Sequence, residues 1–569
     1  MGRPKQTPPA RPAADATARR ATGLTSRRGF FARSGAATVA LAAAGPLAPL
    51  AAGAAPRGLF QHGVASGDPL ADRVILWTRV TPQVAKDRLR VDWRVARDPE
   101  LVDAVQGGSV VTDAAQDWTV KVDPAGLQPG TTYYYRFSVG GVHSPVGRTR
   151  TLPVGALDHL RLAVVSCSNF AAGYFNAYRR IAERADLDAV VHLGDYLYEY
   201  ADGQYGSTRP CEPPHEIVTL DDYRRRHAQY KGDPDSQEML RQHPLIAIWD
   251  DHETANNAWV AGAENHQPDG EGAWPARVAA ALQAYHEWMP VRPVKKDLRR
   301  DNHRYAFGDL VDLFTLEERL TGRSEQLTAD IPTPFGMAFA QAGEYLDPAR
   351  SILGAPGEQW ITGQLRKSTA RWKLLGQGVM FAQLKAVGAP NAQGGGLFLN
   401  PDQWDGYQPA RNRLYDVIQG SDGRGPVRNV VVLTGDIHSA WAADLTRDPN
   451  NPDVRGGGYD PATGEGALAV EFVATSVSSP GLDDPGDTLA TYLRSQNPHF
   501  RYIDLNRRGY LVIDATPERL VGEYWQLETV AAPDGRQTLA AAFAVHDGAA
   551  HLVPSPGAAS RRRRARLAP

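Results

Sequence analysis

Apolar residues along the chain follow two different patterns, and these predict two kinds of domain. Between residues 59 and about 153, apolar and polar residues alternate in short runs such as VILWTRV (74–80) and LRVDWRV (89–95), with turn-rich segments between them. From about residue 158, short apolar runs alternate with segments of helical spacing. We therefore expect an all-β module at residues 56–155 and an α/β domain at residues 156–530.

The α/β part contains several continuous apolar runs that predict buried strands. They are LRLAVVSCS (160–168), DAVVHL (188–193), LIAIW (245–249), NVVVLTG (429–435) and ALAVEFVATS (467–476). The segment FNAYRRIAERA (175–185) has helical spacing. Residues 259–305 and 386–425 are rich in Gly, Pro and polar residues, and we interpret them as surface insertions. Residues 531–569 are expected to form a C-terminal extension that ends in a basic tail.

The N-terminus combines the elements of a twin-arginine export signal. Arg27 and Arg28 precede Phe30-Phe31, and an Ala-rich run and the small-residue segment Ala52-Gly53-Ala54 follow. Gly and Pro residues interrupt the Ala-rich run, which argues against a membrane-spanning helix. We expect residues 1–55 to be a signal peptide recognised by the twin-arginine export machinery. The mature protein would then be secreted or periplasmic, with no membrane span.

The amino-acid composition restricts the kind of partner that the protein binds. Of 569 residues, 42% are hydrophobic and 22% are charged, which is ordinary for a globular protein. The formal net charge is −2, so no excess of positive charge indicates a stable nucleic-acid partner. The chain has two cysteines, Cys167 and Cys211. Two alternatives stay open for them: a disulfide after export, or a free Cys167 thiolate that binds a metal.

Potential metal ligands follow four of the predicted strands. In α/β sheets the loops at the carboxyl ends of strands meet at one crevice, so these groups are expected to converge. Carboxylates, an amide and a phenolate suit hard cations, whereas thiolate and imidazole suit a transition metal, so the set predicts more than one ion. The candidate ligands are Cys167, Asp195, Tyr198, Asp250, Asp251, His252, Asn256, Asp436 and His438.

Four segments together resemble the alkaline phosphatase D family, and more distantly the calcineurin-like metallophosphoesterases. They are SCSNFAAGYFNAYRRIA, HLGDYLYEY, WDDHETANN and LTGDIHSAW, and FQHGVASGDP (60–69) in the front module is also typical. The resemblance covers roughly residues 59–525. It implies a calcineurin-like sandwich of two sheets flanked by helices. The preceding module would be a fibronectin- or immunoglobulin-like β-sandwich, and LQPGTTYYYRFSV (127–139) resembles a late strand of such sandwiches.

The resemblance also implies a cofactor set of one ferric ion (Fe3+) with two calcium ions (Ca2+). Cys167, Asp195, Tyr198 and His438 would hold the iron. Asp195 would also bridge towards calcium, and the remaining oxygen ligands would be Asp251, Asn256 and Asp436. Compared with the wider superfamily, Cys167 replaces the first D-x-H element, Asp251 an Asn and Asp436 a His.

Other candidates would act on the substrate. His252 matches the histidine that lies near the leaving group or the phosphoryl oxygens, and we expect it to be catalytic. The LDTR segment of the family reads here Leu316-Glu317-Glu318-Arg319, so any role of its Asp is in doubt. Arg319, Arg323 and His499 are the candidate phosphate or substrate contacts.

The expected function is hydrolysis of phosphate mono- or diesters by a metal-bound hydroxide, serving phosphate scavenging. The substrate would be a small phosphate ester, such as a phospholipid or a nucleotide. A phospholipase D-type diesterase is an alternative of the same chemistry. A non-catalytic, calcium-dependent extracellular binding protein is an alternative from another class, although structural calcium sites need neither a thiolate nor an Asp-x-His segment.

Overall fold

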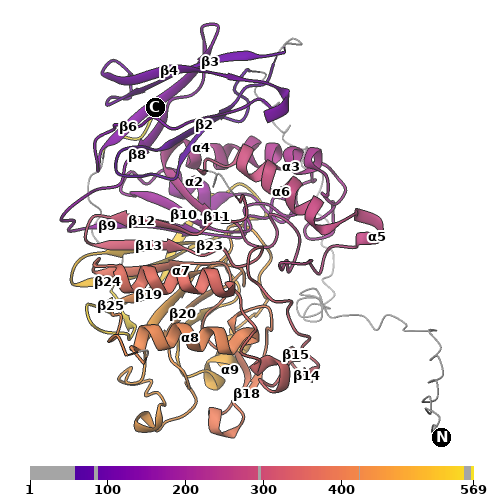
Figure 1. The fold of residues 1–569 in the computed structure, drawn as a ribbon, viewed down its shortest axis with the longest axis vertical. Helices are drawn as coiled ribbons and strands as arrows, with labels where there is room; N and C mark the ends of the chain where they lie inside the picture. Colours follow the sequence, from indigo (N-terminus) through magenta and orange to yellow (C-terminus); the bar gives the residue numbers. More distant parts are fainter. Residues whose placement is uncertain (1–57, 83–86, 293–296, 422, 557–564) are drawn as a thin grey trace, which may run out of the picture.

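The computed structural model describes residues 58–82, 87–292, 297–421, 423–556 and 565–569 (Figure 1). The expected export signal lies outside these ranges. None of the helices within them is long and apolar enough to cross a lipid bilayer.

The N-terminal module is a β-sandwich. One layer contains β3 (Leu89–Ala96), β4 (Ala104–Thr112), β6 (Thr132–Val139), β7 (Val142–His143) and β8 (Gly147–Arg150). The facing layer contains β1 (Val64–Gly67), β2 (Ile75–Arg79) and β5 (Thr119–Val122). Leu76, Val91 and Phe137 lie in the buried cluster between the two layers. The strands predicted at 74–80, 89–95 and 127–139 are confirmed as β2, β3 and β6.

The front module shares a sheet with the second domain. Strand β1 pairs in parallel with β11 (Pro244–Ile248), and this joins β1, β2 and β5 to a ten-stranded sheet in the order β26-β25-β24-β23-β9-β10-β11-β1-β2-β5. The other strands of this sheet are β9 (Leu160–Val165), β10 (Ala189–Leu193), β23 (Gly509–Ala515), β24 (Arg519–Leu527), β25 (Gln537–His546) and β26 (Val553–Pro554). Strands β9, β10 and β11 run parallel to one another.

A seven-stranded sheet packs against the ten-stranded one. Its order is β12-β13-β16-β19-β21-β20-β22. These strands are β12 (His303–Phe307), β13 (Val311–Thr315), β16 (Trp372–Gly376), β19 (Val430–Thr434), β20 (Ala440–Leu445), β21 (Ala469–Val473) and β22 (Phe500–Asp504). Leu162 and Val191 of the large sheet share one buried cluster with Leu313 and Val431 of the smaller sheet, so the two sheets pack face to face.

Helices cover the outer faces of both sheets. On the large sheet lie α2 (Asn176–Ala182), α3 (Leu220–Gly232), α4 (Pro234–Gln242) and α6 (Trp274–Trp288). On the smaller sheet lie α7 (Gly354–Lys367), α8 (Gln408–Gln419) and α9 (Thr488–Gln496). Figure 1 shows this layering, with α3 and α6 on one side of the strands and α7 and α8 on the other. The predicted architecture of two sheets flanked by helices is confirmed.

Two segments differ from the pattern expected for surface insertions. Within 259–305, α6 buries Trp288 completely, and within 386–425, α8 buries Leu414 and Tyr415. Gly and Pro around these helices weaken the local signal, whereas packing against the sheets stabilises the helices. The short elements are α5 (Pro268–Glu271), β14 (Ile331–Thr333), β15 (Gly336–Ala338), β17 (Lys385–Gly388), β18 (Gly396–Phe398), η1 (Ala114–Gln116), η2 (Gly343–Leu346), η3 (Asn391–Gln393), η4 (Trp404–Tyr407) and η5 (Val454–Gly456).

The C-terminal segment also belongs to the fold. Residues 537–554, expected to be part of an extension, form β25 and β26, and β25 pairs with β24 along its length. Alanine is a poor strand former, so the Ala-rich β25 gave little local signal. Ala568 is buried beside Tyr134 of the front module, and its backbone exchanges hydrogen bonds with the Gln242 side chain. Residues 565–569 therefore lie against the front module and α4.

Candidate metal centre

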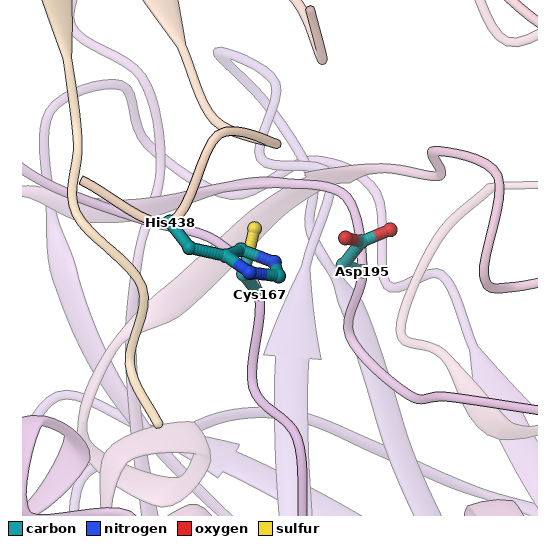
Figure 2. Close-up of side chains that lie close together, drawn as sticks. All are labelled: Cys167, Asp195 and His438. Atoms are coloured by element: carbon teal, nitrogen blue, oxygen red, sulfur yellow. The ribbon is translucent and has the colours of Figure 1, made fainter. Parts of the chain in front are cut away.

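The ends of four strands, β9, β10 and β11 of the large sheet and β19 of the smaller sheet, meet at a single buried cluster. Cys167 follows β9 and Asp195 follows β10, while His438 follows β19 of the facing sheet. Figure 2 shows these three side chains close together, and their potential ligand atoms all lie within 4.8 Å of one another. The convergence expected from the strand ends is confirmed, because parallel strands place their carboxyl ends at the same edge of the sheet.

Two further groups extend this cluster. Asp195, Asp251 and His252 form one, and Asp250, Asp251 and Asp436 form the other; each also has its ligand atoms within 4.8 Å of one another. Asp195 and Asp251 each belong to two groups, so the three groups form one continuous centre. Asp250 stood at a strand end in the sequence, but only the structure shows that it faces Asp436.

The backbone at these positions adopts a conformation that is uncommon for residues other than Gly. Cys167, Asp195, Asp436 and His438 have positive φ angles of 59°, 54°, 61° and 58°. Such conformations cost about 1–3 kcal/mol each and cluster at functional sites. Gly194 also has a positive φ of 91°, and a Cβ there would lie 2.4 Å from Cβ of Asp250. The strands turn sharply here, and this turn brings the ligands of neighbouring strands together.

Glu253 holds the ends of β10 and β11 in register. Its carboxylate accepts hydrogen bonds from the backbone amides of Asp195 at 3.0 Å, Tyr196 at 2.6 Å and Asp250 at 2.9 Å. No sequence pattern singled out this residue, although it follows His252 directly. Because Glu253 is buried, these three amides fix the loops from which the ligands project.

Tyr198 lies beside the first group of potential ligands, Cys167, Asp195 and His438. Its hydroxyl donates to Asp195 Oδ2 at 3.0 Å and lies 3.1 Å from His438 Nε2 and 2.7 Å from the Ser479 hydroxyl. Burial and the neighbouring Asp195 raise the pKa of this phenol well above its usual value. Binding as a phenolate at neutral pH would therefore require a cation beside the oxygen.

The orientation of His438 is set by its other ring nitrogen. Nδ1 lies 2.9 Å from the Pro480 carbonyl oxygen and 3.1 Å from the Tyr205 hydroxyl. A carbonyl can only accept, so Nδ1 carries the proton, and Nε2 is left with its lone pair towards Tyr198 and Asp195. This tautomer is the one that a metal-binding imidazole needs.

His252 is held by Glu199, a residue to which no sequence motif assigned a role. Glu199 Oε2 lies 2.7 Å from His252 Nδ1, and Oε1 of the same carboxylate accepts from the amide of Asn256 and the side chain of Asn265, each at 2.8 Å. Burial lowers the pKa of His252, but Glu199, Asp251 and Asp195 outweigh burial and raise it to about 10. The ring also packs against Tyr198, with centroids 4.2 Å apart.

Arg319 is a cation placed among the carboxylates of this centre. It is completely buried, donates to Asp250 through Nε, and lies 3.5 Å from Asp436 and 3.6 Å from Asp251. Burial raises the pKa of Asp250 to about 7, with Asp251 and Asp436 adding to the rise and Arg319 opposing it. One guanidinium therefore does not neutralise the four acids Asp195, Asp250, Asp251 and Asp436, and the charge balance favours bound cations.

Unpaired buried oxygens indicate where such cations fit. Among the described residues, Oδ1 of Asp195, Oδ2 of Asp250 and Oδ1 of Asn256 are buried without a hydrogen-bond partner. Buried polar atoms are normally satisfied, and a bound ion is one way to satisfy them. Oxygen ligands of this kind suit Ca2+, whereas the thiol, phenol and imidazole of the first group suit a transition metal. The residues present thus fit a mixed metal centre.

The candidate substrate contacts divide into two sets. Arg319 lies at the centre and Arg323 lies beside it on Asp402; both are buried and paired with Asp402, at 3.0 Å and 2.7 Å. His499 does not join the cluster. Its Nε2 contacts the Gln383 carbonyl and its own carbonyl accepts from Asp444, which lies at the far end of β20 from His438. Both cysteines are free thiols, so the disulfide alternative does not apply.

Comparison with known proteins agrees with this geometry. Residues 162–524 match the model of the PhoD-like phosphatase family, and residues 46–153 match that of the PhoD-like phosphatase N-terminal domain. Alkaline phosphatase D of Bacillus subtilis strain 168 is 35% identical over 501 residues, which cover 85% of this chain and 80% of that protein. A solved structure of PhoD has a TM-score of 0.77 at 32% identity and covers 88% of this chain and 93% of its own. This chain therefore belongs to the PhoD-like phosphatase (alkaline phosphatase D) family of phosphoric ester hydrolases.

Proposed function

We propose that this phosphatase is an exported, metal-dependent enzyme that hydrolyses small phosphate mono- or diesters. The observation that carries the metal dependence is the convergence of a thiol, a phenol, two imidazoles and four buried carboxylates in one continuous cluster, with Arg319 beside three of the carboxylates. Membership of a phosphatase family argues against the alternative that the protein is a non-catalytic, calcium-dependent binding protein. Export rests on the twin-arginine segment alone.

The proposed ligand division follows donor chemistry. Cys167, Asp195, Tyr198 and His438 would hold iron, and Asp195 would also contribute to the calcium site. The remaining calcium ligands would be Asp251, Asn256 and Asp436, to which the structure suggests adding Asp250. Metal ions bound there would lower the pKa of water and neutralise charge on the phosphoryl oxygens.

The protein's own groups would orient the ester and move the proton. His252 is the proposed acid or hydrogen-bond donor, because Glu199 holds its Nδ1 and the surrounding acids favour its protonated form. Arg319 would order Asp250 and Asp402 rather than bind phosphate, since its nitrogens are occupied by carboxylates. Arg323 would support Asp402 in the same way.

Two substitutions test this function. Asp195→Asn and His438→Ala are expected to lose metal and to lower hydrolysis of 4-nitrophenyl phosphate or bis(4-nitrophenyl) phosphate by about 100-fold or more. Elemental analysis and initial rates provide the measurements. Asp188→Asn is the control, because Asp188 lies at the opposite end of β10 and binds the backbone of Arg161. An Asp195→Asn or His438→Ala enzyme that keeps both its metal and near-full activity would refute the site.

Two finer points have separate tests. Relative rates on the two nitrophenyl esters distinguish a monoesterase from a diesterase, and release of choline from phosphatidylcholine would favour the phospholipase D-type alternative.

Replacement of Arg27-Arg28 by Lys-Lys is expected to leave the protein inside the cell if the twin-arginine route is used. Normal export of that variant would contradict the proposed route.

A further inference from the structure

A cavity of about 410 Å³ opens directly onto the candidate metal centre. Asp436 and His438, which belong to that centre, also line the cavity, and Ile437 lies between them. This volume is within the usual range for a pocket that holds a small organic group. A phosphate ester bound at the metal centre would therefore have its alcohol part within reach of this space.

Apart from Asp436, Ile437 and His438, most side chains that line the cavity are apolar. They come from segments far apart in the sequence, and include Leu327, Met337, Leu384, Leu399, Leu482 and Leu493. Leu384, Leu399, Leu482 and Leu493 are buried, and Leu327 and Met337 are partly exposed. Polar side chains such as Asn257, Gln326, Thr328 and Asn400 also line the cavity, but they are outnumbered, and a hydroxyl-rich alcohol placed against the apolar part would lose its water without replacement.

The charges around the cavity are all of one sign. Glu264, Glu325 and Asp402 line it, whereas no Lys or Arg does so among the described residues. A second phosphate in the cavity would face the carboxylates of Glu264 and Glu325, which is unfavourable; Asp402 is already ion-paired with the buried Arg319 and Arg323 and adds little to this repulsion. The lining thus disfavours polyphosphates and nucleic-acid backbones, and it favours an uncharged group.

We propose that this cavity binds the apolar alcohol group of the substrate, so that the enzyme selects phosphate esters of alkyl or acyl-chain alcohols. The proposal rests on the proposed function of the metal centre. Leu327 and Met337 are its specificity-determining residues, because they are long, partly exposed apolar side chains of the lining and neither contributes to the centre itself.

The test uses the metal-loaded full-length enzyme and a series of linear monoalkyl phosphates and methyl alkyl phosphodiesters. We expect kcat/KM to rise by roughly 4-fold for each added methylene until the cavity is filled, because each buried methylene contributes about 0.8 kcal/mol. Propyl phosphate should exceed 2,3-dihydroxypropyl phosphate by at least about 10-fold. A flat dependence on chain length, or equal rates for the polar and apolar esters, would overturn the proposal.

Variants and a binding measurement separate this proposal from the function of the centre. Leu327→Gln and Met337→Gln should reduce the chain-length dependence, whereas Leu220→Gln should not, since Leu220 packs against a different core cluster and does not line the cavity. Calorimetry with alkylphosphonates measures the binding affinity of the cavity without turnover. Affinity that rises with chain length but without hydrolysis would support the cavity and contradict the proposed function, and affinity independent of chain length would contradict the cavity.

Discussion

Replacement of Arg319 by Met tests whether this guanidinium is the counter-ion of the metal centre. Arg319 is completely buried, and the carboxylates of Asp250, Asp251, Asp402 and Asp436 around it are each at most 5% exposed. Nη1 donates to both oxygens of Asp402, at 3.0 and 3.1 Å. Met is flexible and uncharged and fills the space of the Arg stem, so the substitution removes the charge and the hydrogen bonds while keeping the apolar part of the side chain.

The magnitude follows from the burial of these partners. Removal of one member of a buried ion pair costs about 3–5 kcal/mol, because the remaining charge is left without compensation in a poorly solvated site. The loss in free energy of unfolding does not grow in proportion to the number of carboxylates, since a buried acid takes up a proton instead of staying charged. We therefore expect Arg319→Met to lower the free energy of unfolding by about 3–5 kcal/mol in a chelating buffer near neutral pH.

The pH dependence of this loss has a definite sign. Without Arg319, the pKa of Asp250, already raised to about 7, would rise further. A carboxyl group whose pKa is higher in the folded than in the unfolded state binds more protons when folded, so its contribution to stability falls as pH rises through that range. The penalty of Arg319→Met should thus be larger at pH 8 than at pH 5.5.

Urea denaturation of the variant and the wild type, followed by tryptophan fluorescence, measures the effect. Arg97→Met is the matched control, because Arg97 pairs with Asp103 at 2.7 and 3.1 Å while both side chains are about half exposed. Exposed pairs contribute about 0–1 kcal/mol. If Arg319→Met destabilised the protein no more than Arg97→Met does, or more at pH 5.5 than at pH 8, the counter-ion role would be wrong.

Three further substitutions probe the same centre. Glu199→Gln should lower kcat by about 10- to 100-fold with metal content retained, because it weakens the hold on the imidazole of His252, the proposed catalytic group. Gly194→Ala should destabilise the fold well beyond Gly203→Ala in thermal unfolding; both have positive φ, but only at Gly194 would the new Cβ meet another strand end. Cys167→Ser should lose the transition metal while keeping calcium in elemental analysis, whereas Cys211→Ser should keep both.

Each of these has an outcome that contradicts it. Wild-type kcat in Glu199→Gln would mean that other contacts orient the imidazole. Equal thermal midpoints for Gly194→Ala and Gly203→Ala would mean that the strand ends have room to separate. Full iron content in Cys167→Ser would remove the thiolate from the ligand set.

Local sequence patterns were sufficient to predict the strands that carry the centre. Strands β9, β10, β11 and β19 are each a continuous apolar run followed by a turn with a polar residue, and both features lie within about ten residues of sequence. Convergence of their ends followed from the general geometry of α/β sheets. Long-range features had weaker signals: the Ala-rich strand β25 is defined by its pairing with β24, which periodicity does not encode.

The sequence by itself thus determined the order of the elements, the ligand types at the strand ends and the family to which the motifs belong. Only the tertiary structure decided which of these groups meet. It places Asp250 opposite Asp436, Glu199 against His252 and Arg319 among four carboxylates, and it places His499 at the other end of β20. The physical reason is that such contacts join residues far apart in the sequence, 53 positions for His252–Glu199 and 117 for Arg319–Asp436. Their geometry depends on strand order, register and sheet packing, which no local pattern of hydrophobicity specifies.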